Sequence, residues 1–337
     1  MKKFIGRRLF LGLIVLFGVI FIVFSMTRVL PVDIAQKWAG DKATPEQVEA
    51  AREELGLNDP FLIQFGNYVI DLVHGDLGKS YTTHRSVTDE LKEVIPVTFE
   101  LVFICMIVGL FCGVLLGLYS AQHKNKVFDH FGRFFSVAMM SLPSFWIALA
   151  LQLVFYGILG IFPLAGRLST EITVLYGMPH YTGMLILDCI IEGNPIILKD
   201  ALWHIVLPLT PLCMVSTAYV ARMVRSSMIE ILGEDYIIAE KSYGIKEAFI
   251  LWVFSLKNAR GFIATLFAMD FAYMLVNTYL VETIYSWPGI GKYIADSITS
   301  LNYPAIMGAT IFSAFACVIC NLLADLVVAT DPRVRTS

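Results

Sequence analysis

The stretch that decides the fold is Thr98–Tyr119, TFELVFICMIVGLFCGVLLGLY, which is apolar over nearly its whole length. An α-helix rises about 1.5 Å per residue, so about 20 residues are needed to cross about 30 Å of hydrocarbon. This stretch has the required length. It predicts a membrane-spanning α-helix.

Five further apolar runs of similar length lie at 9–29, 134–158, 203–221, 262–284 and 305–328. The composition agrees with a bilayer environment, because 57% of the 337 residues are hydrophobic and only 16% are charged. Soluble domains have about 45–50% apolar and about 25% charged residues. The sequence therefore predicts an all-α polytopic membrane protein with six transmembrane helices.

The first run follows basic residues and so resembles a signal peptide. The segment Ser25–Arg28 offers no small-residue cleavage site, so we expect an uncleaved span. With the amino terminus placed inside, Lys and Arg exceed Asp and Glu in the inside segments, and the reverse holds outside. This asymmetry predicts that both termini are cytoplasmic.

The long segment after the first span carries its own helix signals. Thr44 as N-cap, Pro45 at the first helical position and Gln47 at the third start one helix, and 61–73 is an amphipathic second one. We therefore divide the chain into a first transmembrane helix (1–30), a small external helical subdomain (31–96) and a core of five transmembrane helices (97–337) with a cytoplasmic loop at 222–261.

Several features inside the core predict local structure. Gly109, Gly113 and Gly117 form a flat stripe that favours close packing against another helix. Pro143 predicts a kink in the third span. The run Met184–Ile191 is too short to cross and predicts an external or re-entrant helix. Ser286–Gly291 predicts a tight turn with Trp287 at the membrane interface.

The loop 222–261 contains GEDYIIAEKSYG at 233–244. A glycine followed by two acidic residues favours a helix start, and Gly244 suits the left-handed position that ends a helix. Tyr236, Ile237, Ala239 and Tyr243 place apolar surface on the water side of the membrane. Such a helix is suited to the groove of a partner protein.

This loop resembles the EAA loop of the binding-protein-dependent ABC permeases, specifically the dipeptide and oligopeptide branch. Other stretches resemble the same branch and are spread over nearly the whole chain. They are Phe4–Arg8, Glu54–Leu57, His74–Gly78, Arg222–Met228, Gly233–Tyr236, Lys257–Ala259 and Glu282–Gly291.

The resemblance implies a type I ABC importer permease fold and a permease subunit in the cell inner membrane, translocating di- or oligopeptides. It implies as partners a second homologous permease, two ATP-binding subunits and an extracytoplasmic solute-binding protein, with ATP and Mg²⁺ held by the ATP-binding subunits and no cofactor on this chain. The ATPase-coupling role then passes by position to Glu234, Asp235, Tyr236, Ala239, Glu240 and Gly244.

The chain departs from the family pattern at two places in this loop. It has Ile238-Ala239-Glu240 at the name-giving residues, and Phe262 follows Arg260-Gly261 where a proline is usual. These departures predict weaker coupling or a divergent ATPase.

Enzymatic chemistry has little support in the sequence. No GxxxxGK[ST] loop is present, and Gly291-Lys292 lacks both the earlier glycine and the following Ser or Thr, so ATP hydrolysis by this chain is excluded. HExxH and GxSxG are absent, and the six histidines are scattered. The Cys317–Cys320 pair has no second pair, so we predict neither a metal site nor catalysis.

A proton-coupled secondary transporter is the rival interpretation, because Asp270 and Asp325 lie in apolar segments. We expect Asp325 to pair with Arg333 or Arg335 near the cytoplasmic end. For Asp270, pore lining or pairing with another subunit remains open beside structural hydrogen bonding.

We take the third and fifth spans as the pore lining, with Ser141, Ser144, Asp270 and Asn277 as polar groups of the translocation pathway. The run Phe162–Arg167 resembles the peptide permeases more than the nickel permeases. Nickel, metal chelates and glutathione remain alternative substrates within the same machinery.

Overall fold

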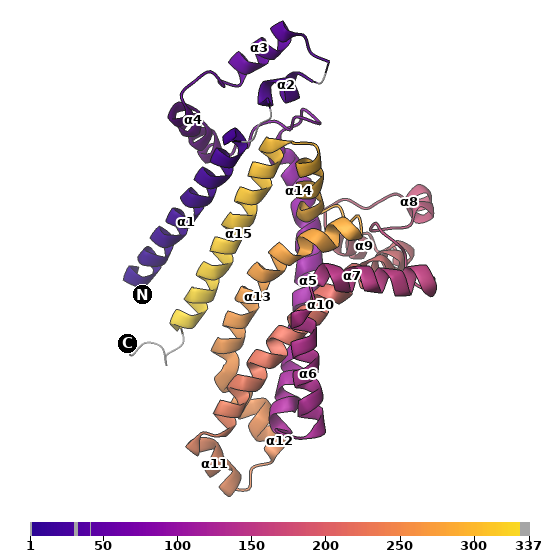
Figure 1. Ribbon diagram of the computed structural model, residues 1–337. Helices are drawn as coiled ribbons and strands as arrows, with labels where there is room; N and C mark the ends of the chain where they lie inside the picture. The colour runs from indigo at the N-terminus through magenta and orange to yellow at the C-terminus, as the bar shows by residue number, and fades with distance from the viewer. Residues whose placement is uncertain (1, 30–32, 41, 331–337) are drawn as a thin grey trace.

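The computed structural model describes residues 2–29, 33–40 and 42–330, which fold almost wholly into helices (Figure 1). The first part of the chain forms α1 (Lys2–Val29), α2 (Ile34–Ala39), α3 (Pro45–Glu54), α4 (Phe61–Val73), α5 (Val87–Gln122), α6 (Val127–Ser141), α7 (Ser144–Leu151) and the π-helix η1 (Gln152–Ile158). The second part forms α8 (Thr170–Tyr176), α9 (Leu185–Glu192), α10 (Pro195–Leu232), α11 (Asp235–Ser242), α12 (Glu247–Phe249), the π-helix η2 (Ile250–Ser255), α13 (Leu256–Ile284), α14 (Ile290–Thr299) and α15 (Tyr303–Thr330).

The membrane spans follow the hydropathy of the sequence. Helices α1, α5, α10, α13 and α15 each contain an apolar window long enough to cross a bilayer. Helix α6 and the continuous α7–η1 segment make a sixth span if they are taken together, but they are bent by 99°. The all-α polytopic architecture is therefore as predicted, with one span broken.

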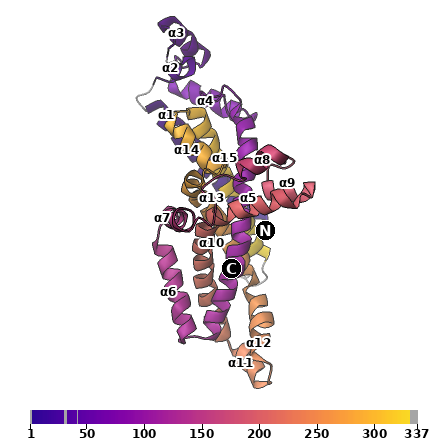
Figure 2. The same cartoon turned by 90° about the vertical axis from the view of Figure 1, so that its right-hand side faces the viewer.

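The break falls at Leu142 and Pro143, so the predicted kink is present and is much sharper than a simple bend. Proline has no N–H for the helical ladder and fixes its own φ, so α6 ends before it and α7 starts after it. Helix α6 runs beside α10, whereas α7 contacts α10 and α13 and points sideways out of the bundle, as seen along its length in Figure 1 and end-on in Figure 2.

Helices α5 and α10 form the central contact of the fold, and the predicted glycine stripe makes it. A Cβ atom added at Gly109 would lie 2.4 Å from Ser216 Oγ, at Gly113 2.6 Å from Val220 Cβ, and at Gly117 2.8 Å from the backbone oxygen of Ala221. No side chain fits in these gaps. The two backbones approach closely because these three positions of α5 have no side chains.

The segment between α1 and α5 holds α2, α3 and α4. Thr44 and Gln47 form the predicted capping box at the start of α3, with Thr44 N donating to Gln47 Oε1 at 2.9 Å. Helix α4 has the predicted bounds and packs Phe65 against Phe24 of α1 and Met307 of α15. These helices lie at one end of the molecule, and α11 lies at the other (Figure 1).

Two sequence expectations on single residues have different outcomes. Trp287 is 1% exposed and packs in the main core, so the expectation that its side chain anchors the turn in the membrane interface is wrong. Asp325 pairs with Arg8 of α1 at 3.1 Å, which ties α15 to α1. Arg333 and Arg335, its expected partners, lie outside the described residues.

We predict that Gly113→Ala lowers the melting temperature of the purified protein, corresponding to a loss of about 1–3 kcal/mol from overpacking against Val220. Gly18→Ala is the matched control, because it is also a helical glycine in a span but has no atom within 4 Å of the added Cβ. Its higher helix propensity should leave stability unchanged or raised. Equal melting temperatures for both variants would contradict the close contact.

Candidate functional site

Helix α11 connects α10 to α12, η2 and α13 at the end of the molecule opposite α2–α4 (Figure 1). It begins after Glu234, whose φ and ψ are extended, and Asp235 lies in its first turn. An acidic first turn complements the partial positive charge of a helix N-terminus. The predicted short helix is therefore present.

The two faces of α11 differ. Ile237 is 0% exposed and packs the helix against the rest of the chain, and Asn258 Nδ2 donates to the Tyr236 hydroxyl at 2.7 Å. The opposite face is open to solvent at Glu234, Asp235 and Ala239. The outward surface includes the large apolar side chains of Ile238 and Tyr243, which are 53% and 86% exposed.

Gly244 ends this segment with a φ of +78°, the left-handed conformation predicted for it. The Ile245 N–H reaches back to the Glu240 carbonyl at 3.3 Å, and the Gly244 N–H to that of Lys241 at 3.0 Å. A Cβ atom at Gly244 would meet nothing within 4 Å. The requirement for glycine here is conformational, and the space around it is open.

The two departures from the family pattern lie away from the exposed face. Glu240 is half-buried, and its Oε2 atom has no hydrogen-bond partner. Phe262 is half-buried against the cluster that Val220, Met228 and Leu266 help to form between α5, α10 and α13. Both residues are therefore partly covered by the chain itself.

Three of the four predicted pathway residues come together at the α6–α7 break. Ser141, Ser144 and Asn277 line a cavity of about 220 Å³, with Val215 and Tyr273 on its walls. Ser141 and Asn277 each form a hydrogen bond within their own helix. Ser141 Oγ donates to the Val137 carbonyl at 2.7 Å, and Asn277 Nδ2 donates to the Tyr273 carbonyl at 2.8 Å. The cavity wall therefore carries amide and hydroxyl groups without a charge.

Asp270 lies elsewhere, buried at 2% exposure between α13 and α10. Its Oδ2 atom accepts a hydrogen bond from Ser216 Oγ, and its Oδ1 atom has no partner. The Ser216 side chain is also the one that faces Gly109 of α5. Of the alternatives left open for Asp270, the structure shows hydrogen bonding within the chain.

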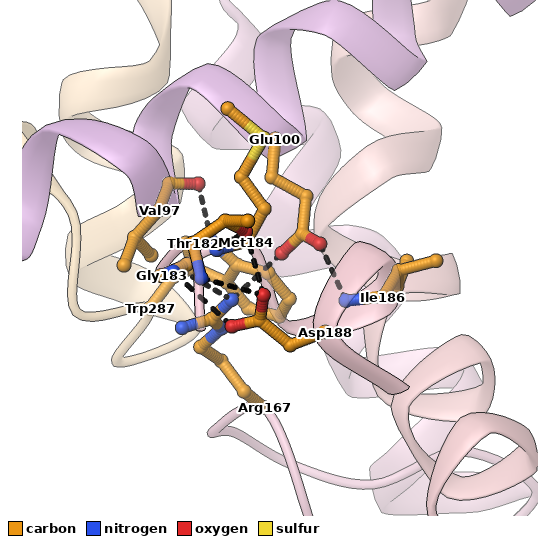
Figure 3. A network of polar contacts seen from close by, with 9 residues as sticks. All are labelled: Val97, Glu100, Arg167, Thr182, Gly183, Met184, Ile186, Asp188 and Trp287. Atoms are coloured by element: carbon orange, nitrogen blue, oxygen red, sulfur yellow. Dashed lines mark hydrogen bonds and ion pairs between the residues drawn. The ribbon is translucent and has the colours of Figure 1, made fainter. Parts of the chain in front are cut away.

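A polar network that the sequence did not reveal fixes the loops at the α2–α4 end of the core (Figure 3). Glu100 of α5 is 4% exposed; its Oε2 accepts from Arg167 Nη2 at 2.7 Å, and its Oε1 accepts from the Ile186 N–H in the first turn of α9. The Arg167 guanidinium lies 5.6 Å from the Trp287 ring centre. One buried carboxylate thus joins α5, the 160–183 loop and α9.

Asp188 of α9 holds the same loop from the other side. It accepts hydrogen bonds from Thr182 N at 2.8 Å, Thr182 Oγ1 at 2.6 Å and Gly183 N at 3.1 Å. Burial alone would raise the pKa of Asp188, but these hydrogen bonds stabilise its charged form and leave the pKa below its usual value. The loop is therefore held by a carboxylate that stays ionised.

Another buried carboxylate, that of Glu282, explains the glycines at 289 and 291. Glu282 is 0% exposed; Oε1 accepts from Thr98 Oγ1 and Oε2 from the Gly291 N–H, both at 2.7 Å. A Cβ atom would lie 2.4 Å from Glu282 Oε1 at Gly289 and 2.4 Å from Tyr279 Cα at Gly291. The turn from α13 to α14 closes around Glu282 because both positions lack side chains.

A fourth buried carboxylate fixes the opposite end of the core. Asp129 of α6 is 0% exposed and accepts from Nε and Nη2 of Arg225 on α10. Arg225 belongs to the Arg222–Met228 stretch noted in the sequence, and Arg167 to the Phe162–Arg167 stretch. The signal available in the sequence was a charged residue within an apolar stretch. A periodic pattern does not identify the residue with which that charge pairs.

No cluster of three or more His, Cys, Asp or Glu side chains suited to a metal ion occurs among the described residues. The two ends of the core are thus held by buried carboxylates, and the exposed helix α11 lies between α10 and α13, two of the helices that line the cavity.

Comparison with known sequences agrees with this arrangement. Residues 113–336 match the family described as "Binding-protein-dependent transport system inner membrane component", and residues 1–102 match the N-terminal region of such components. This chain belongs to that family. It is therefore an inner membrane component of a transport system, a non-catalytic membrane subunit.

Relatives resemble the chain over almost its whole length. A probable D,D-dipeptide transport system permease protein of Escherichia coli (strain K12) is 38% identical over 322 residues, covering 95% of this chain and 94% of the relative. A di/tripeptide transport system permease protein of Pseudomonas aeruginosa (strain UCBPP-PA14) is 34% identical over 337 residues, covering 99% of each.

We predict that Arg167→Ala in this family member lowers stability by about 3–5 kcal/mol, because it leaves the Glu100 carboxylate buried without its cation. Adding Glu100→Gln should recover part of the loss. Arg85→Ala is the control, since its pair with Glu93 is half exposed to solvent, which screens the interaction and leaves little stability to lose. Thermal unfolding of the purified protein measures all three, and similar losses for Arg167→Ala and Arg85→Ala would contradict the role of the network.

Proposed function

We propose that this chain is the translocation subunit of an ATP-driven importer for short peptides. It pairs with a second, homologous permease subunit, and two ATP-binding subunits hold ATP and Mg²⁺ and dock on α11. A solute-binding protein delivers cargo on the α2–α4 side. The observation that carries the proposal is an exposed helix, α11, that lies in the chain between α10 and α13, two of the helices that line a polar cavity.

The orientation follows from charge. Lys and Arg concentrate at the α1 start and in the loops at the α11 end, whereas the segment holding α2–α4 is acidic. Both termini and the loop 222–261 are then cytoplasmic, and 31–96 is an external helical subdomain before the core permease domain at 97–337. This places α11 on the side where ATP is available.

The connectivity of the helices indicates how a movement caused by nucleotide binding is transmitted to the cavity. Helix α10 enters α11 and contributes Val215 to the cavity; α13 follows α12 and η2 and contributes Tyr273 and Asn277. A displacement of α11 by its ATPase is passed to both helices, because Ile237 and Tyr236 fix α11 to its own chain. The cavity then alternates between inward-facing and outward-facing states.

Peptide cargo is supported by the named relatives and by the lining of the cavity. Two relatives are named for dipeptide or di/tripeptide transport. Ser141, Ser144 and Asn277 offer uncharged donors and acceptors, which suit a peptide backbone that must bind and leave again. Nickel, metal chelates and glutathione are the alternative cargoes, and a proton-driven mechanism is the alternative energy source.

We predict that Gly244→Val abolishes ATP-dependent uptake of a dipeptide into proteoliposomes containing the complete transporter, lowering the rate at least about tenfold. Valine is strained at a φ of +78°, so the end of α11 must change shape. Gly193→Val is the matched control, because Gly193 has a φ of +74°, also has open space around its Cβ and ends α9 instead.

The same vesicles separate the alternatives. Uptake that needs ATP and the ATP-binding subunits supports the importer, while uptake driven by a proton gradient with this chain alone overturns it. Normal uptake by Gly244→Val, or an equal loss in Gly193→Val, would remove the coupling role from α11. Competition by dipeptide, glutathione and nickel identifies the cargo.

We predict that Asn277→Leu lowers the transport rate about tenfold without lowering the ATPase rate of the assembled transporter, because it removes the amide from the cavity wall. Thr283→Val is the control: it lies on the same helix, and its hydroxyl also bonds a carbonyl four residues back, but it is outside the cavity. If both variants transport normally, the cavity is not part of the pathway.

A further inference from the structure

A second polar cavity, of about 180 Å³, lies where the end of α1, helix α4 and the start of α15 meet. These three elements come together at the α2–α4 end in Figure 1. Phe24, Phe65 and Met307 form an apolar cluster beside it. It is separate from the cavity at the α6–α7 break.

Four buried side-chain atoms without hydrogen-bond partners belong to residues that line this cavity. They are Arg28 Nε, Gln64 Oε1, Tyr68 Oη and Tyr303 Oη, out of seven such atoms among the described residues. Tyr303 as a whole is 3% exposed. A buried polar atom left unpaired costs about 1–3 kcal/mol, so their gathering at one place indicates a shared partner inside the cavity.

The charges of the lining identify the chemistry of that partner. Arg28 is the only cation among the lining residues and has no ion pair with a described carboxylate; its guanidinium lies 4.9 Å from the Phe24 ring centre. A guanidinium beside two tyrosine hydroxyls supplies donors to an anion, and arginine binds phosphate bidentately. Asp71, the only carboxylate of the lining, is solvent-exposed.

The surroundings place the cavity at the surface of the bilayer. Arg28 lies in the last turn of the apolar helix α1. Helix α4 turns Leu62, Ile63, Ile70 and Val73 away from the protein, with exposures of 51–79%. An amphipathic helix with such a face lies in the membrane interface, and tyrosines gather at headgroup level.

We propose that this cavity binds the headgroup of a phospholipid, with the phosphate on Arg28, Tyr68 and Tyr303. The exposed carboxylate of Asp71 then selects a headgroup that also carries an ammonium, namely phosphatidylethanolamine. The site ties α1, α4 and α15 to one leaflet of the bilayer. Phosphate chemistry is shared by lipid and free phosphate, and the test distinguishes the two.

The test uses the complete transporter, purified and delipidated in detergent. It is titrated with short-chain phosphatidylethanolamine, with phosphatidylglycerol of equal chain length and with inorganic phosphate, while the melting temperature is followed. Native mass spectrometry counts the retained lipid. We expect a saturable rise with phosphatidylethanolamine, a weaker one with phosphatidylglycerol and none with inorganic phosphate.

Two variants and a control locate the effect. Arg28→Gln should weaken phosphatidylethanolamine binding at least about tenfold, as expected for a charged hydrogen bond. Arg7→Gln, at the opposite end of α1, should bind like the unaltered chain. Tyr303→Phe separates ligand binding from folding: without lipid it should melt at the same or a higher temperature, because it removes an unpaired hydroxyl, yet its lipid-induced rise should shrink.

Each other outcome overturns the proposal. Equal responses to both lipids remove the role of Asp71, and a response to inorganic phosphate makes the cavity a free-anion site. Absence of any saturable response, or unchanged binding in both Arg28→Gln and Tyr303→Phe, shows that the cavity holds only water.

Discussion

The contact between α5 and α10 is the constraint on which the other helices depend. It is made through the absence of side chains at Gly109, Gly113 and Gly117, where even a methyl group would overlap the facing helix. In a bilayer, burying apolar surface between helices gains little, since lipid tails are as apolar as leucine, so close packing must supply the attraction. Helices α6, α7 and α13 then pack against this pair.

Buried carboxylates determine which segments meet in that packing. Glu100, Glu282 and Asp129 each join segments far apart in the sequence, and each is fully or almost fully buried. A buried ion pair such as Glu100–Arg167 adds little net stability over apolar packing, but breaking it is costly. These groups therefore make alternative arrangements unfavourable. They select one way for the loops to close over the helix ends.

The sequence is informative wherever the signal is local. Hydropathy located the spans, Thr44 and Gln47 located the capping box, and Gly244 located the left-handed helix end. Pro143 indicated a kink, but the 99° angle depends on how α7 packs across the bundle, which no local pattern contains. Trp287 was misplaced for the same reason: its burial depends on Val97, Arg167 and the turn around Glu282.

The polar partnerships were beyond sequence reasoning because they are non-local. Thr98 and Glu282 are 184 residues apart, and Glu100 and Arg167 are 67 apart. A periodic pattern shows that a carboxylate will be buried, but it does not say which loop returns to meet it. Ser141, Ser144 and Asn277 were selected for residue type near the kink, and tertiary packing brought them together, while Asp270, selected on the same grounds, faces Ser216 instead.

The distribution of these bonds separates rigid from movable parts of the molecule. At the Glu100 and Glu282 sites, hydrogen bonds cross between segments, so moving one segment would leave a buried carboxyl group without its partners. At the cavity, Ser141 and Asn277 bond to carbonyls of their own helices. Separating α6 from α13 at the cavity breaks neither bond, whereas α7 is tied to the end of α13 by the Tyr285 hydroxyl, which donates to the Ala148 carbonyl at 2.8 Å. Among the described residues, the wall of the cavity is therefore free of hydrogen bonds between α6 and α13, whereas the loops at the Glu100 and Glu282 sites are held by bonds that cross between segments.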